Sequence, residues 1–267
     1  MKKLSIFAVA LAAVAFAACT GNKTQNVQDD KDSVKSFEQE QIEENIKVQI
    51  DSLASEFGKL KPLPILKDQN GSVVLSDEEK QVKPDYLLSP SAAENAVTLA
   101  EKYRTLSALS LDKQIASAYD MPTDEYDEAL AKLSADINDP SFKVLDDVSS
   151  AFDASSKLYN AMEENGRINY FWQMAAAALV EQLYVTTQNT DKFISAFDDS
   201  SAENVTFRII LLQDAIERLA VYDPELQPIS DAIEPLKVLN AITVDQFKSQ
   251  LEECKDQISA SRKTLFQ

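Results

Sequence analysis

Apolar side chains recur at spacings of three and four residues along most of the chain. Two stripes show this clearly: Tyr126, Leu130, Leu133, Ile137; and Val205, Ile209, Leu212, Ile216, Leu219. The spacing gathers apolar side chains on one face of an α-helix, whose period is about 3.6 residues. Only 4 glycines interrupt the 267 residues, so few positions favour a break. The sequence therefore predicts an all-α protein.

Short breaks separate these helical segments. Proline or glycine stands at Met121-Pro122, Asn138–Pro140, Asn165-Gly166 and Asp223-Pro224. Short connections make consecutive helices antiparallel, so we expect a multi-helix bundle or an array of helix pairs. A single helical domain over residues 33–267 is the first expectation, and two subdomains that meet near residue 166 are the second.

Several helix starts carry the pattern of a capping box, in which a Ser or Thr is followed three residues later by Glu or Gln. The predicted boxes are Ser76 with Glu79, Ser91 with Glu94, Ser200 with Glu203, and Thr243 with Gln246.

One segment departs from the helical pattern. Asn70-Gly71 separates two short apolar runs within residues 65–75. Asn-Gly is the preferred two-residue loop of a β-hairpin, because both positions need positive φ. A small β-hairpin is therefore predicted there.

The N-terminus has the features of an export signal. A basic start, Met1-Lys2-Lys3, precedes an uncharged run from Leu4 to Ala18. This run is shorter than the roughly 20 apolar residues that span a bilayer. Residues 1–18 are therefore predicted to be a secretory signal peptide.

The end of this run resembles the lipobox of bacterial lipoproteins. The residues are Phe16-Ala17-Ala18-Cys19, with Phe16 where an aliphatic residue is usual. The resemblance implies that Cys19 is lipidated and becomes the new N-terminus. The membrane is then a binding partner of the chain, through the lipid on Cys19. Ordinary cleavage after Ala15-Phe16-Ala17 is the alternative. Residues 19–32 are rich in polar side chains, as expected of a flexible tether.

Charge and composition exclude several functions. The formal net charge of −18 opposes binding to nucleic acid, which requires clustered Lys and Arg. The chain contains no histidine, so Ser-His-Asp catalysis and His-ligated metal sites are excluded. No motif for a catalytic site, a cofactor or a metal is recognised. With Cys19 lipidated, Cys254 is the other cysteine, and its register on an apolar stripe predicts a core position.

The segment from Arg167 to Tyr184 is apolar nearly all round, so we expect a helix through the middle of the bundle. It carries Glu181, and a later apolar helix carries Arg208. An unpaired buried charge is costly, so Glu181 and Arg208 are predicted to pair. The pair would fix the register of the helices, or it would belong to a ligand pocket. The pocket's lining residues would be Tyr170, Trp172, Glu181, Tyr184 and Arg208.

The stretch Ala178–Val185 resembles a group of helical lipoproteins from Bacteroidota that carry a W-x-E-x-L-Y-like turn on a central helix. Glu181, Leu183 and Tyr184 match this turn, and Leu179 stands where the tryptophan would be. The resemblance implies fold and location but no activity. Thr20–Lys23 lacks the acidic signal that often sorts surface lipoproteins of that phylum. We therefore expect an outer-membrane anchor facing the periplasm, with the cell surface as the alternative.

Two classes of function stay open. The first is a non-catalytic binding or interaction module for an envelope protein or a small ligand, because the usual nucleophile, base and metal constellations are absent from the sequence. The second is an envelope hydrolase that uses carboxylates alone, with two acids about 5 to 9.5 Å apart. A weaker alternative is cation binding by clustered Asp and Glu. No second carboxylate is recognised beside Glu181.

Overall fold

The computed structural model describes residues 37–60, 63–68, 72–147 and 151–266. The predicted signal peptide, Cys19 and the tether lie outside the described residues, as does Asn70-Gly71.

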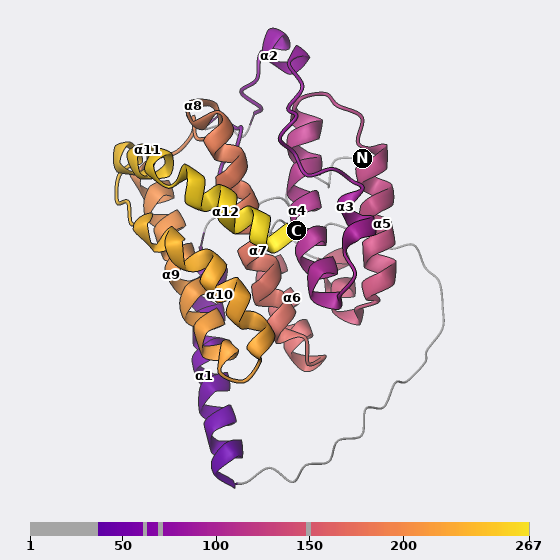
Figure 1. Ribbon diagram of the computed structural model, residues 1–267, viewed down its shortest axis with the longest axis vertical. Helices are drawn as coiled ribbons and strands as arrows, with labels where there is room; N and C mark the ends of the chain where they lie inside the picture. Colours follow the sequence, from indigo (N-terminus) through magenta and orange to yellow (C-terminus); the bar gives the residue numbers. More distant parts are fainter. Residues whose placement is uncertain (1–36, 61–62, 69–71, 148–150, 267) are drawn as a thin grey trace.

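The chain is built of helices joined by short connections (Figure 1), which confirms the all-α prediction. The α-helices are α1 (Phe37–Lys59), α2 (Asp77–Gln81), α3 (Ala92–Asn95), α4 (Leu99–Ala118), α5 (Asp124–Ile137), α6 (Ala151–Glu164), α7 (Ile168–Gln188), α8 (Thr190–Phe193), α9 (Asp199–Ala220), α10 (Gln227–Ile233), α11 (Val244–Glu253) and α12 (Lys255–Phe266). Three 3-10 helices complete the fold: η1 (Pro140–Asp147), η2 (Pro224–Leu226) and η3 (Glu234–Val238).

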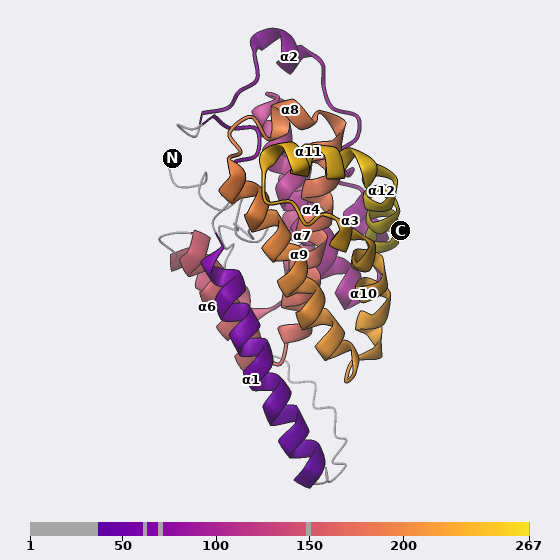
Figure 2. The ribbon, with the colours of Figure 1, turned by 90° about the vertical axis from the view of Figure 1, so that its left-hand side faces the viewer.

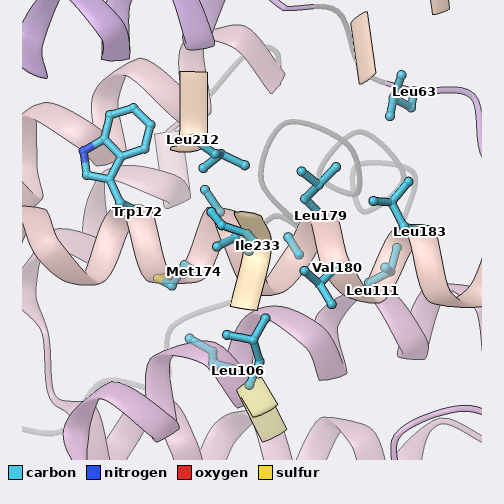
Figure 3. Close-up of a cluster of buried hydrophobic side chains, with 14 of the residues drawn as sticks. Leu63, Leu106, Leu111, Trp172, Met174, Leu179, Val180, Leu183, Leu212 and Ile233 are labelled. Carbon is cyan, nitrogen blue, oxygen red and sulfur yellow. The ribbon is translucent and has the colours of Figure 1, made fainter. Parts of the chain in front are cut away.

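Helix α7 forms the centre of the bundle, as predicted from its apolar sequence. It packs against α4 on one side and α9 on another, and α6, α10 and α12 also contact it (Figures 1 and 2). Its four consecutive alanines, Ala175–Ala178, are buried, and small side chains let neighbouring helices approach closely. In Figure 3, Met174 and Val180 of α7 lie among Leu106 of α4 and Ile233 of α10.

Helix α1 packs on the outside of the bundle, against α6 and α9. Its first turns extend beyond the other helices (Figure 2). Farther along, Ile50 and Phe57 are buried in the core. Within the part of the chain that the structure describes, no helix has the length and apolar character needed to cross a membrane.

A tight connection at Gly166 joins α6 to α7. Gly166 has a φ of 65°, in the left-handed region that favours glycine. Apolar side chains from both sides of this glycine belong to one buried cluster. The choice between one domain and two subdomains stays a prediction.

The predicted β-hairpin at residues 65–75 is wrong. Among its described residues there is a single antiparallel bridge, between Lys67 and Val73, and no strand. Leu66 has a φ of 52°, which interrupts an extended backbone. Its N–H donates to Phe193 O of α8 at 3.1 Å while its carbonyl accepts from Val74 N–H at 3.1 Å, so Leu66 divides its backbone hydrogen bonds between α8 and the facing segment.

Cys254 lies where α11 ends and α12 begins, and its side chain is buried. This confirms its predicted place in the core. Burial raises the pKa of the Cys254 thiol, which favours the neutral form.

The predicted capping boxes have mixed outcomes. Ser76 and Glu79 form a complete box at α2, as predicted. Thr243 Oγ1 accepts from the backbone N–H of Gln246, which is half of the predicted arrangement. Ser91 makes no side-chain cap.

Helix α9 is capped by Asp198 with Ser201, so the predicted box of Ser200 with Glu203 is wrong. The observed N-cap of α9 comes two residues before the predicted one, because Asp198 is the residue with extended backbone dihedrals.

Thr98 and Glu101 form a complete capping box at α4, and Thr98 is exposed. Replacing Thr98 with alanine should lower the free energy of unfolding by about 1 kcal/mol, because the backbone N–H of Glu101 loses its acceptor, Thr98 Oγ1. Urea denaturation measures the change. Thr123→Ala is the matched control, since Thr123 begins α5 without a side-chain cap, and its effect should stay within about 0.5 kcal/mol. Equal losses in the two variants would contradict the capping explanation.

Candidate functional site

Glu181 of α7 is fully buried, and its partner is Arg262 of α12. Arg262 Nε donates to Glu181 Oε2 at 2.7 Å, and Nη2 donates to Oε1 at 2.9 Å. The guanidinium lies 4.0 Å from the ring centroid of Tyr184, one turn after Glu181 on α7. The two-point contact between Arg262 and Glu181 is among the strongest pairings available to a carboxylate.

A second carboxyl group, Asp112 of α4, lies beside Glu181 and is also fully buried. Asp112 Oδ2 accepts from the backbone N–H of Leu88 at 2.7 Å. Its pKa is raised well above the usual range, first by burial and then by the negative charge of Glu181. Burial and the neighbouring Glu181 therefore favour the neutral carboxylic acid form of Asp112.

The hydrogen-bonding pattern agrees with this protonation state. No described group donates a hydrogen bond to Asp112 Oδ1. The side chains of Asp112 and Glu181 are within hydrogen-bonding reach of each other. An Asp112 Oδ1–H that donates to Glu181 satisfies both observations. We call Asp112 and Glu181 the carboxyl pair.

Arg262 carries the positive charge of this cluster. Burial raises the pKa of Glu181, whereas the hydrogen bonds from Arg262 act against this rise and favour the ionised carboxylate. Burial lowers the pKa of Arg262, but Glu181 more than offsets that effect and the net shift is upward. The contact with Arg262 thus favours the ionised form of Glu181, while the form favoured for Asp112 is the neutral one.

A non-helical connection, residues 82–91, lies against the carboxyl pair and Arg262. Besides the Leu88 N–H bond to Asp112, the carbonyl of Tyr86 accepts from Arg262 Nη2 at 3.2 Å. The carbonyl of Leu88 accepts from the Tyr126 hydroxyl at 3.1 Å. The cluster therefore joins α4, α7 and α12 to this connection.

The predicted pairing of Glu181 with Arg208 is wrong. Arg208 Nε donates to Asn204 Oδ1 at 2.8 Å, and its guanidinium lies 5.5 Å from the ring centroid of Phe57. Burial lowers the pKa of Arg208 to about 10. Both oxygens of Glu181 instead accept from the arginine of α12.

The five residues predicted to line a pocket fall into three groups, each with its own contact residue. Tyr170 stacks on Tyr103 of α4, with ring centroids 4.6 Å apart. Trp172 packs edge-on against Phe57 at 5.7 Å. Of the predicted set, Glu181 and Tyr184 share Arg262 as a partner, and Trp172 and Arg208 share Phe57.

Sequence reasoning missed Asp112 and Arg262, although each carries a signal. Arg262 follows Ile258 by four residues and precedes Leu265 by three, so it lies beside the apolar stripe of α12. Asp112 is an isolated carboxylate among the apolar residues of α4. A charge in such a place requires a partner, but its position does not say which one.

The described residues contain no group of three or more acidic or cysteine side chains arranged to hold a metal ion. Comparison of the chain with family models, with curated proteins and with solved structures gives no match in any of the three.

Proposed function

We propose that this chain is a lipid-anchored protein of the cell envelope whose helical body is a non-catalytic interaction module. The basic start, the apolar run and the lipobox-like Phe16–Cys19 support the anchor. The resemblance to helical lipoproteins of Bacteroidota supports an outer-membrane location facing the periplasm, with the cell surface as the alternative.

The observation that supports a non-catalytic function is the burial and hydrogen bonding of the carboxyl pair. Hydrolysis by two carboxyl groups requires space for a substrate between them, with a separation of about 5 to 9.5 Å. Asp112 and Glu181 are instead in mutual contact, fully buried and bound by Arg262 and Leu88. This arrangement favours a structural role for the pair over the hydrolase alternative.

Membrane attachment is tested by intact mass and fractionation of the native protein. We expect a chain that begins at Cys19, carries acyl groups and sediments with membranes. Cys19→Ser should release the protein into the soluble fraction, because the anchor is lost. Cys254→Ala is the matched control and should remain with the membranes. An unmodified Cys19 in a soluble wild-type protein would contradict the anchor.

The interaction module is tested by crosslinking in living cells. Recovery of one envelope protein in stoichiometric amount would support it. Should hydrolytic activity appear on envelope substrates and disappear in Glu181→Gln, the hydrolase alternative would replace this proposal.

A further inference from the structure

Many of the exposed large apolar side chains come from one segment of the chain. Six of the ten large apolar residues that stand out as exposed belong to α9 and the segment after it, up to residue 242. Phe207 and Ile210 of α9 are about half exposed, at 53% and 52%. They are three residues apart and are therefore neighbours on the same face of the helix.

Two more exposed apolar residues, Val238 and Ile242, come from a segment that runs beside α9. Lys237 Nζ donates to Glu217 Oε1 at 2.9 Å near one end of α9. Near the other end, Thr206 Oγ1 donates to the carbonyl of Ala241 at 2.9 Å. Residues 237–241 therefore lie along α9, next to the side of the helix that carries Ile210.

These four residues, Phe207, Ile210, Val238 and Ile242, form what we call the α9 patch. The opposite flank of α9 is covered by α1, where Arg218 of α9 donates to Gln49. Figure 2 shows α9 on the outside of the bundle beside α1. The patch is thus an exposed face of α9 that lies between α1 and residues 237–241, and an exposed apolar helix face can pack against another helix.

The charges around the patch favour a positively charged partner. Three acidic residues, Glu203, Asp214 and Glu217, share the exposed face of α9 with Phe207 and Ile210. Asp214 pairs with Arg218 and Glu217 with Lys237, whereas Glu203 forms no ion pair with any described residue. The whole chain carries a charge of −18, which opposes both a second copy and anionic lipid headgroups.

We propose that the α9 patch is the docking surface of the interaction module and that its partner is a basic amphipathic helix of another envelope protein. This inference rests on the proposed function. Apolar side chains of the partner cover Phe207 and Ile210, and a lysine or arginine of the partner faces Glu203. Glu203 and the negative charge of the whole chain supply orientation and a faster encounter, while the apolar centre supplies affinity.

Binding in solution is measured by fluorescence anisotropy with the full chain carrying Cys19→Ser. The probe is a synthetic Leu–Lys peptide with leucines at helical spacing, and a Leu–Glu peptide of the same length is the comparison. The Leu–Lys peptide should bind at least about ten-fold more tightly than the Leu–Glu peptide. Combining Phe207→Gln with Ile210→Gln should raise its Kd by about ten-fold, and Glu203→Gln should raise it by a smaller factor.

Val97→Gln is the matched control, since Val97 is 80% exposed and precedes α4, outside the patch. It should leave the Kd unchanged. All the substitutions replace exposed side chains, so thermal melting should show the same fold. An equal loss in the patch variant and the control, or equal binding of both peptides, would overturn the proposal.

Crosslinking in cells identifies the natural occupant. A photoreactive benzoylphenylalanine in place of Phe207 should form one adduct, joined to a basic amphipathic segment of another protein. An adduct with a second copy of this chain or with phospholipid would overturn the docking proposal. So would an adduct from a probe at Val97 with none from Phe207, although the interaction module itself would then stand. Loss of the anchor would show separately in the fractionation of Cys19→Ser.

Discussion

Replacing Arg262 with methionine is expected to lower the free energy of unfolding by about 3–5 kcal/mol. The long apolar stem of methionine retains much of the packing, but Glu181 loses both of its charge-assisted hydrogen bonds. The carboxylate is fully buried, so solvent cannot replace the lost partner. Urea denaturation at neutral pH, followed by circular dichroism, measures the loss.

Two further variants separate charge from packing. Combining Glu181→Gln with Arg262→Met removes both charges, so the double variant should recover much of the stability lost in the single one. Arg218→Met breaks the exposed pair with Asp214, whose side chains are each about 40% exposed, and should cost less than about 1 kcal/mol. If Arg262→Met costs no more than Arg218→Met, the buried ion pair does not stabilise the bundle.

Replacing Asp112 with asparagine is expected to make the protein more stable at neutral and alkaline pH. Asparagine has the shape of a neutral carboxylic acid, so its oxygen can accept from Leu88 N–H and its amide can donate to Glu181. The unfolded chain ionises Asp112 near its ordinary pKa of 3.8, whereas the folded chain holds this pKa far higher. Asparagine does not ionise in either state.

The sign of the pH dependence follows from this difference. A folded pKa above the unfolded one contributes stability that is present below the unfolded pKa and is lost as pH rises through the folded pKa. The wild type should therefore lose stability relative to Asp112→Asn from about pH 4 upward, by at most about 1.4 kcal/mol per pH unit. Urea denaturation of both proteins between pH 4 and pH 9 measures this difference.

Asp112→Leu is the control for the hydrogen bond. Leucine has the same branching but is larger and leaves the Leu88 N–H without an acceptor, so this variant should be less stable than Asp112→Asn at every pH. A constant difference between the wild type and Asp112→Asn across the pH range would mean that Asp112 does not hold a proton in the folded state.

The sequence by itself determined the helical architecture and the element at its centre. Apolar spacing of three and four residues specifies which face of each helix is buried, because the helical period is a local property. The segment that became α7 is apolar nearly all round, and a helix of that kind is most stable when other helices surround it, because all its apolar faces are then removed from water. Cys254 was placed in the core by the same reasoning.

Only the tertiary structure decided which charges meet. Burial of Glu181 required an opposite charge, yet Arg208 and Arg262 both stood near apolar faces and the sequence gives no order of helices in space. The chosen partner, Arg262, is 81 residues away and comes from α12. Asp112 was added to the cluster by the packing of α4 on α7. At residues 65–75, the left-handed backbone of Leu66 and its hydrogen bond to Phe193 leave a single bridge and no strand among the described residues. Periodicity is a one-dimensional property of the chain, whereas ion pairing and strand formation depend on three-dimensional neighbours.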